Sequence, residues 1–209
     1  MRERELYMQE ILNIENVDNS GYETLVRAYK SLLSDWNTKI NLVSGRNVHN
    51  LLTELIRQSI QPLNSLQIPL GAALLDVGSG AGLPAFPLKF ARPDLSLVLL
   101  EPRRMKWLFL RRVIEELKLE NCQALRTRLE DMTTLPDWQH AFDLVTTRGA
   151  GRAADLYPWM EPLVKPGGQV WFYKGPTARR EARELQALTV HPVKLIELEP
   201  HFSLIVVNL

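Results

Sequence analysis

A glycine-rich loop is the segment of this sequence with the clearest chemical meaning. It reads Asp76-Val77-Gly78-Ser79-Gly80-Ala81-Gly82-Leu83-Pro84, follows a short apolar run and opens a helical pattern. Glycine lets the chain turn sharply and lets a ligand come close to the backbone. In open α/β sheets, ligands bind beyond the carboxyl ends of the strands, where such a loop lies. The loop therefore predicts a small-molecule site, and a tight turn without a ligand is the alternative.

The spacing of the glycines favours one class of ligand. A dinucleotide-binding loop would carry its third glycine at the position of Leu83. Here Gly78, Gly80 and Gly82 alternate instead, and the first of them follows Asp76 by two residues. This pattern resembles the first motif of S-adenosylmethionine-dependent methyltransferases. A nicotinamide-dependent oxidoreductase is the less favoured alternative.

Polar residues also follow the next two predicted strands. Glu101 comes directly after the second apolar run. A carboxylate there can accept hydrogen bonds from both ribose hydroxyls of a nucleoside, whereas a solvated strand-end glutamate is the alternative. The segment 127–130 follows the third run, where methyltransferases usually meet the adenine. Chance seldom produces such residues at the ends of three successive strands.

Alternating patterns predict the elements that position these residues. From residue 72 onward, short apolar runs alternate with helical patterns, which is typical of a mostly parallel sheet with helices on both faces. The last two runs have no helix between them, which favours an antiparallel hairpin at one edge. The expected strands are 72–77, 95–100, 122–125, 142–146, 169–173, 193–198 and 204–207. The expected helices are 83–91, 104–117, 153–163 and 178–188.

The N-terminal part of the chain has a different pattern. Residues 22–36 and 48–60 carry apolar side chains at helical spacing, and a weaker helix is expected within 6–14. We expect 1–68 to be a helical extension packed on the catalytic domain, and 69–209 to be that α/β domain.

Composition limits the class of protein. The chain has 209 residues, of which 45% are apolar and 23% charged, which is typical of a globular protein. Lys and Arg number 25 against 24 Asp and Glu, so any nucleic-acid contact must come from a local patch.

A single cysteine, Cys122, excludes an intrachain disulfide. With no apolar stretch near the roughly 18 residues of a membrane span and no visible secretory signal, we expect a soluble cytoplasmic monomer. No Cys/His cluster has metal-ligand spacing, so we expect no metal.

Several short segments together are similar to one family. They are Trp36-Asn37, Asn41-Leu42-Val43-Ser44, the loop 76–84 with its Gly-Leu-Pro ending, 117–121, Arg128-Leu129-Glu130, Phe142-Asp143, Thr147-Arg148-Gly149-Ala150 and Tyr173-Lys174-Gly175. They resemble the RsmG family, also called glucose-inhibited division protein B, bacterial methyltransferases of guanine N7 in small-subunit ribosomal RNA. The resemblance covers essentially the whole chain.

The resemblance implies a fold, a cofactor and a partner. The fold would be a Rossmann-like class I methyltransferase with a seven-stranded sheet. The cofactor would be S-adenosyl-L-methionine, with S-adenosyl-L-homocysteine as product, and the partner would be small-subunit (16S) ribosomal RNA or a ribosomal particle. Carried over by position, the cofactor residues are Gly78, Leu83, Leu129, Glu130 and Arg148. The arguments from the loop and the strand ends add Gly80, Gly82 and Glu101.

The chain departs from the family pattern in residues that concern the RNA contact. The family usually carries a His and an Asp in the helix before the linker, and the segment 54–59 keeps only Ser59. The usual Lys-Arg pair after the second-strand acid is Met105-Lys106 here, with Arg103 and Arg104 beside it. The chain also lacks a basic tail after its last strand.

Methyl transfer to guanine N7 makes modest demands on side chains. N7 carries an available lone pair, so no general base is needed, and catalysis would rest on proximity and alignment. We expect Arg148, at the end of the fourth strand, to be the catalytic residue that orients the cofactor or a phosphate. The alternative is a surface arginine paired with Asp143 or Asp155. The four histidines are scattered through the sequence and none is expected to be catalytic.

Local basic residues supply the predicted RNA contacts. We expect Arg103, Arg104 and Lys106 to neutralise phosphates, which would make RNA binding salt-dependent. Lys174, after the fifth strand, is expected to hold a phosphate, with a surface lysine as the alternative. The target would be a loop or splayed base, because a duplex guanine is hard to reach.

Other polar residues have structural interpretations. Arg111 and Arg112 precede glutamates by four residues, the spacing of intrahelical ion pairs. A solvated helix face is expected for Arg179, Arg180 and Arg183. Asn37 and Asn41 are expected either to cap the turn after the helix or to shape an RNA-binding entrance, and Trp36 to pack in the core.

These observations favour guanine-N7 methylation of ribosomal RNA. Because the fold and the cofactor loop do not determine the acceptor, a methyltransferase of another acceptor stays open. A non-catalytic RNA-binding assembly factor with the same fold is the alternative from another class. Cofactor binding would distinguish the two classes.

Overall fold

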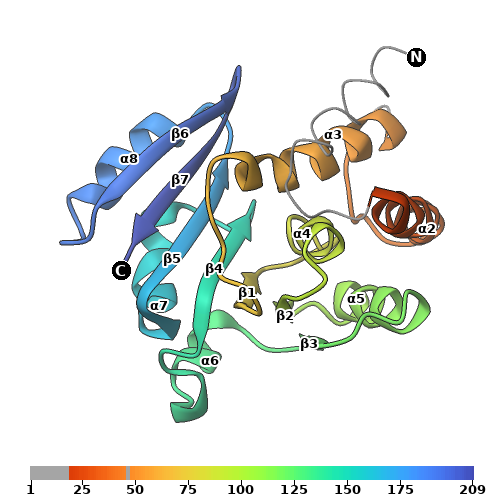
Figure 1. The fold of residues 1–209 in the computed structure, drawn as a ribbon, viewed down its shortest axis with the longest axis horizontal. Coiled ribbons are helices and arrows are strands. Elements are labelled where there is room, and N and C mark those ends of the chain that lie inside the picture. Colours follow the sequence, from red (N-terminus) through yellow and green to blue (C-terminus); the bar gives the residue numbers. More distant parts are fainter. Residues whose placement is uncertain (1–18, 46–47) are drawn as a thin grey trace.

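Seven strands form one sheet at the centre of the protein. The computed structural model describes residues 19–45 and 48–209, so the helix expected within 6–14 lies outside the described residues. The order across the sheet is β3-β2-β1-β4-β5-β7-β6 (Figure 1). The strands are β1 (Ala73–Val77), β2 (Ser96–Leu100), β3 (Cys122–Leu125), β4 (Phe142–Arg148), β5 (Val164–Lys174), β6 (Val193–Glu199) and β7 (Phe202–Asn208).

The first five strands are parallel, as the alternating pattern predicts. β1 pairs with β2 and β4, and the parallel ladder continues to β3 on one side and β5 on the other. β1 and β2 bury almost every side chain, because parallel strands are covered on both faces. β7 runs antiparallel to both β5 and β6. The predicted edge hairpin is therefore confirmed, with β7 as its inner strand.

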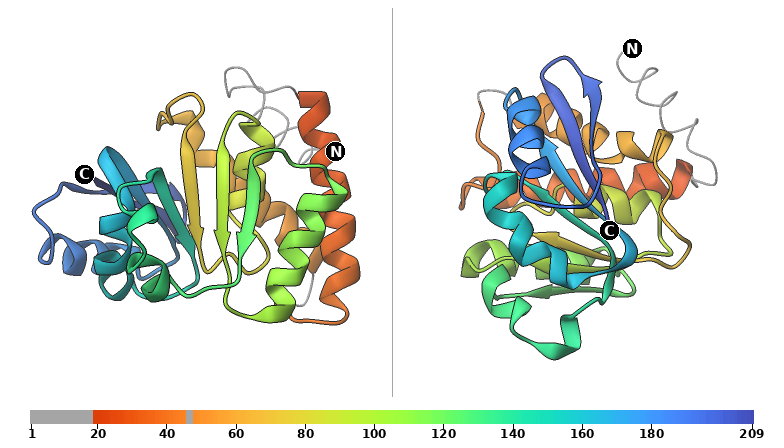
Figure 2. Two further views of the ribbon diagram at one scale, coloured as in Figure 1. Left: turned by 90° about the horizontal axis from the view of Figure 1, so that it is seen from below. Right: turned by 90° about the vertical axis from the view of Figure 1, so that its left-hand side faces the viewer.

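Helices cover both faces of the sheet. One layer holds α2 to α5 and the other holds α6 to α8, each over its own apolar cluster (Figure 2). This arrangement confirms the Rossmann-like architecture. The helices are α2 (Asn19–Asn37), α3 (Val48–Ile60), α4 (Ala85–Ala91), α5 (Arg104–Glu116), α6 (Leu129–Thr133), α7 (Ala153–Met160) and α8 (Ala178–Gln186). None of the described helices is long and apolar enough to span a membrane.

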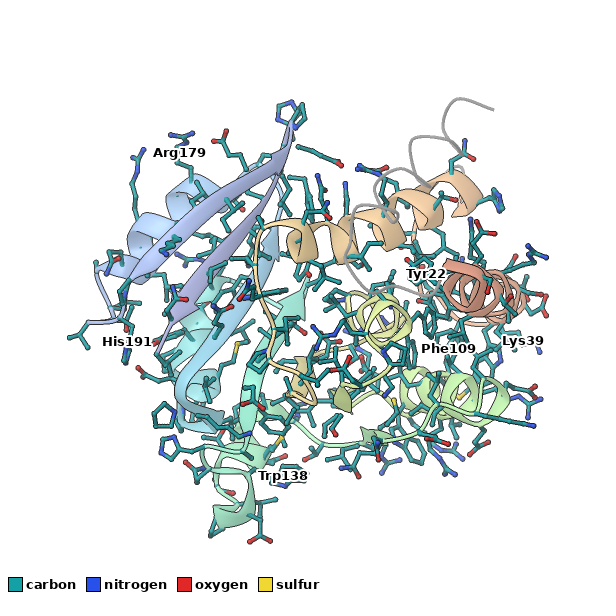
Figure 3. The ribbon with its side chains drawn as sticks, in the orientation of Figure 1. Tyr22, Lys39, Phe109, Trp138, Arg179 and His191 are labelled. Carbon is teal, nitrogen blue, oxygen red and sulfur yellow. The ribbon has the colours of Figure 1, made fainter. Side chains whose placement is uncertain are left out.

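The two N-terminal helices belong to the same apolar cluster as one face of the sheet. Tyr22, Tyr29 and Leu33 of α2 are fully buried there. Figure 3 shows Tyr22 of α2 and Phe109 of α5 in this layer. Trp36 also packs on Phe109, with 5.7 Å between ring centroids, as predicted for a core residue. The boundary between 68 and 69 stays a prediction.

Some element limits differ from expectation. β5 begins at Val164, because the segment before Gly168 also pairs with β4 across an irregular register. The helix expected over 153–163 ends at Met160 and continues as the 3₁₀ turn Glu161–Leu163. α6 was not expected, since its five residues are too few to show a helical period.

Candidate cofactor and RNA site

The carboxyl ends of the parallel strands meet at one edge of the sheet. Val77 pairs with Leu100 on one side and Thr147 on the other, and Leu100 pairs with Leu125. The residues after these strands must therefore be neighbours. This register places four segments next to one another: the glycine loop, Glu101, the 126–130 segment and the 149–152 loop.

Two glycines of the loop leave no room for a side chain. Gly82 has φ +84°, and a Cβ on it would lie 2.1 Å from Cδ2 of Phe86. Gly78 has φ +69°, and a Cβ on it would lie 2.7 Å from Cβ of Ala150. L side chains rarely adopt such backbone angles. The loop is thus packed between α4 and the 149–152 loop.

Glu101 is bound to the glycine loop. Its side chain is 5% exposed. Oε2 accepts a hydrogen bond of 3.0 Å from the Gly80 N–H, and Oε1 accepts one of 2.8 Å from the Arg103 N–H. A carboxylate offers about four acceptor sites, so the fixed group retains acceptors for ribose hydroxyls. This geometry argues against a solvated glutamate.

Asp76 has an unusual environment that the sequence analysis did not assign. Its side chain is completely buried, and Oδ1 accepts a hydrogen bond of 2.8 Å from Thr146 Oγ1. Oδ2 is buried without a partner among the described residues. Burial raises the pKa of Asp76 to about 7, although the Thr146 and Ser79 hydroxyls oppose the rise, and the Glu101 charge adds to it. Few buried acceptors in folded proteins lack a partner, and this one directly precedes the glycine loop.

These groups fit S-adenosylmethionine. The cofactor carries an ammonium group, a sulfonium and two ribose hydroxyls, so it offers donors and positive charge to Asp76 and Glu101. Leu83 and Leu129 are both buried, and they offer apolar surface at the ends of β1 and β3. Glu130 is exposed in the first turn of α6.

Arg148 contacts a helix that the sequence pattern did not connect to it. Its guanidinium is directed to α3, where it donates to Gln58 Oε1 at 2.5 Å and to the Leu55 carbonyl oxygen at 3.3 Å. It also lies 5.0 Å from the ring centroid of Phe202. Burial lowers the pKa of Arg148 to about 10. No ion pair joins it to Asp143 or Asp155 among the described residues, and its contact with a cofactor or phosphate stays a prediction.

The ammonium group of Lys174 is bound by other groups of the protein. It is 8% exposed, and its Nζ lies 2.8 Å from Oε2 of Glu181, which is 5% exposed. Nζ also donates to the Gly151 carbonyl oxygen at 2.5 Å. This geometry does not favour the predicted phosphate contact, and the surface-lysine alternative is wrong.

The basic residues after β2 are available. Arg103 and Arg104 are exposed and Lys106 is half-buried, and none forms an ion pair with a described residue. A Cβ on Gly80 would lie 3.9 Å from Lys106 Nζ, so this ammonium lies beside the glycine loop. Arg126 and Arg128, exposed after β3, extend the group. Because β2 and β3 pair in parallel, the residues that follow the two strands lie side by side. The sequence pattern alone did not show this proximity.

The remaining polar predictions have structural outcomes. Asn37 caps the turn: its Oδ1 accepts from the backbone N–H groups of Leu42 and Val43 at 2.9 Å. Asn41 is exposed and accepts from the Ser44 hydroxyl. The ion pairs of Arg111 and Arg112 with glutamates of α5 are confirmed, and Arg179 points away from the protein (Figure 3). Within the described parts of the chain, no three potential metal ligands cluster.

Comparison with known structures supports the fold. A solved methyltransferase from Aquifex aeolicus that depends on S-adenosylmethionine aligns with a TM-score of 0.58 at 14% identity, covering 72% of this chain and 88% of the other. The Thermus thermophilus 16S rRNA N2 G1207 methyltransferase aligns with a TM-score of 0.51 at 20% identity, covering 74% and 38%. The chain therefore has the fold of a class I methyltransferase that depends on S-adenosylmethionine.

Comparison of sequences defines the family. A Ribosomal RNA small subunit methyltransferase G from Lachnoclostridium phytofermentans is 32% identical over 186 residues, which cover 89% of this chain and 77% of the relative. The protein of the same name from Desulfitobacterium hafniense is 35% identical over 163 residues, covering 78% and 67%. The family model GidB, described as rRNA small subunit methyltransferase G, matches residues 22–199. The chain thus belongs to the GidB family of small-subunit rRNA methyltransferases.

Proposed function

We propose that this protein transfers the methyl group of S-adenosylmethionine to N7 of a guanine in small-subunit ribosomal RNA. The observation that carries the proposal is the buried, unpartnered Oδ2 of Asp76 beside the glycine loop. A donor-rich cationic ligand would satisfy this atom, and membership of the GidB family identifies that ligand as the methyl donor. We also propose that the enzyme acts in the cytoplasm as a monomer.

The cofactor would be held by groups that are already in place. Gly78, Gly80 and Gly82 let it approach the backbone, and Glu101 would accept hydrogen bonds from its ribose. Its sulfonium supplies an activated methyl group. The apolar walls would be Leu83 and Leu129, with Glu130 near the adenine. Asp76 would accept from the ammonium group, which would compensate its desolvated charge.

Transfer to N7 requires alignment rather than proton transfer. N7 has a free lone pair, so the protein needs to hold the base in line with the methyl group, which can supply several kcal/mol. No described residue needs to act as a general base. Because the Arg148 guanidinium is hydrogen-bonded to α3, we assign it a positioning role for that helix instead of contact with the reacting atoms.

RNA would bind over the ends of β2 and β3. Arg103, Arg104 and Lys106 stand at the N-terminus of α5, where the helix dipole disfavours positive charge. The first turn of α5 contains no acidic residue. Positive charges at this end of α5 lower the stability of the helix. A role in neutralising RNA phosphates would explain why they are there. Asn37 and Asn41 would border the same substrate through the turn that follows α2.

A methyl-transfer assay tests the proposal. Small ribosomal subunits from a strain lacking this enzyme would be incubated with labelled S-adenosylmethionine, and the product nucleoside identified by mass spectrometry. We expect labelled 7-methylguanosine at one ribosomal RNA site. A different labelled nucleoside would mean that another atom or base accepts the methyl group. If no RNA were labelled while cofactor binding could still be measured by calorimetry, ribosomal RNA would be refuted as the substrate. Loss of both would favour a non-catalytic binder.

A further inference from the structure

The buried ion pair between Lys174 and Glu181 connects three elements near the site. Lys174 ends β5, Glu181 lies in α8, and their charged atoms are 2.8 Å apart with less than a tenth of either residue exposed. Burying two charges is costly unless their remaining hydrogen-bonding capacity is satisfied. The partners that satisfy it show what the pair holds.

Those partners lie at the start of α7 and in the loop before it. Lys174 Nζ donates to the Gly151 carbonyl oxygen at 2.5 Å. Glu181 Oε2 accepts from the Ala153 N–H, the first of α7, at 2.8 Å. Glu181 Oε1 accepts from the Thr177 hydroxyl at 2.7 Å. The carboxylate thus satisfies an N–H at the positive end of a helix, so Lys174 is anchored to the 149–152 loop and Glu181 to the residue that follows it.

The same loop packs against the cofactor loop. Cβ of Ala150 occupies the space beside Gly78, where an added side chain would come within 2.7 Å of it. Gly78 is the first residue after β1 and Arg148 is the last of β4, and these two strands are neighbours. The position of the 149–152 loop therefore sets one wall of the glycine loop.

We propose that Lys174 and Glu181 are positioning residues that hold the 149–152 loop against the glycine loop and so set the affinity for the methyl donor. In this role the pair acts through its contacts within the protein. The inference rests on the proposed function for the identity of the ligand. It also explains the Tyr173-Lys174-Gly175 segment, in which the lysine is used by the fold and not by RNA.

The test compares Lys174→Met, Glu181→Gln and the double variant by calorimetry with S-adenosylhomocysteine. Each single variant should weaken binding by on the order of tenfold, because small displacements of binding groups have effects of this size or greater. The double variant should bind no more weakly than the weaker single variant, since the two residues act as one unit. Lys174→Arg should restore part of the affinity.

RNA binding separates this role from a phosphate contact. If Lys174 bound a phosphate, Lys174→Met would lower the slope of log K against log salt by about one, and Glu181→Gln would leave cofactor affinity unchanged. That pair of results would overturn the proposal. We expect the slope to be the same in all three variants. Cofactor binding needs no RNA, so the proposal can be judged even if ribosomal RNA proves not to be the acceptor.

Two further variants keep the test decisive. Ala150→Gly leaves the ion pair intact, and should still weaken cofactor binding several-fold, which matters if a variant of the buried pair fails to fold. Arg152→Ala removes the ion pair with Glu184, which joins the same loop to α8 on the exposed side. Exposed pairs contribute little, so this matched control should bind the cofactor normally. Unchanged affinity in Ala150→Gly would overturn the proposal.

Discussion

The hydroxyl of Tyr29 in α2 donates a hydrogen bond of 2.7 Å to the carbonyl oxygen of Ala81 in the glycine loop. The tyrosine is completely buried, and its ring packs against Phe86 and Phe90 of α4 at centroid distances of 5.7 and 5.8 Å. One atom of the N-terminal helical layer thus fixes a backbone group in the middle of the cofactor loop. Removing α2 would therefore disturb the cofactor loop as well as the core.

Tyr29→Phe removes this hydroxyl and keeps the ring. The Ala81 carbonyl would lose its buried donor, at a cost of roughly 1–3 kcal/mol. We expect the melting temperature to fall by a few degrees and the affinity for S-adenosylhomocysteine to fall several-fold in calorimetry. Tyr157→Phe is a matched control, since its hydroxyl bonds to Glu161 and Thr189. Tyr157→Phe should lower the melting temperature but leave the affinity for S-adenosylhomocysteine unchanged. Equal affinities of Tyr29→Phe and Tyr157→Phe for this ligand would contradict the prediction.

Asp76 should make cofactor binding depend on pH. Burial raises its pKa to about 7, and the nearby Glu101 carboxylate adds to the rise. The ionised form is the one that attracts an ammonium group, so affinity should increase by up to about tenfold between pH 6 and pH 8 and then level off. Asp76→Asn should bind more weakly and lose this dependence. Calorimetry at the two pH values checks this, and a parallel pH profile in the variant would contradict it.

The same carboxyl should affect stability in the opposite direction. Its folded pKa of about 7 lies above the ordinary value of 3.8, so the folded protein binds more protons in this range. Stability from this group is complete below about pH 4 and is lost as pH rises through 7. Without cofactor, Asp76→Asn should therefore gain melting temperature over the natural protein as pH rises from 5 to 8. A constant difference across that range would argue against the raised pKa.

The sequence allowed the cofactor loop to be predicted because its information is local. The glycines, the preceding apolar run and the acid after β2 lie in short contiguous segments, and parallel pairing brings them together without further specification. Arg148 could not be placed in this way. Its position at the end of β4 was predictable, but its partners Leu55 and Gln58 are about 90 residues away in the chain. Lys174 likewise owes its burial to Glu181 on the next helix, which no periodic pattern singles out.

Arg148 provides a test of positioning against direct contact. Gln58 lies in the segment where this chain departs from the family pattern, and it links Arg148 to Glu54 through its amide, which donates to Glu54 Oε1 at 2.8 Å. Arg148→Ala should reduce methyl transfer by about tenfold or more and destabilise the protein. Gln58→Leu should have a similar but smaller effect if the guanidinium acts by holding α3. Single-turnover rates and cofactor affinity measure both.

The contrary outcome for Arg148 is specific. If Gln58→Leu left the rate and the cofactor affinity unchanged while Arg148→Ala abolished cofactor binding, the guanidinium would have to leave α3 and contact the ligand. Arg148 would then have the cofactor role that the sequence predicts.

Arg103 and Arg104 offer the clearest separation of function from stability. Both are exposed at the N-terminus of α5 without an ion pair to a described residue, where the helix dipole opposes positive charge. Replacing both by alanine should leave the melting temperature unchanged or slightly higher, and cofactor affinity unchanged. RNA binding should weaken, and the slope of log K against log salt should fall by about two, one for each phosphate contact. Arg179 and Arg180 are also exposed, but they pair with Glu197 of β6 and Glu184 of α8. Their double alanine variant should leave the slope intact, because both cations are already paired with carboxylates of the protein. An unchanged slope for Arg103→Ala/Arg104→Ala would move the RNA-binding surface to Arg126 and Arg128, the exposed arginines that follow β3.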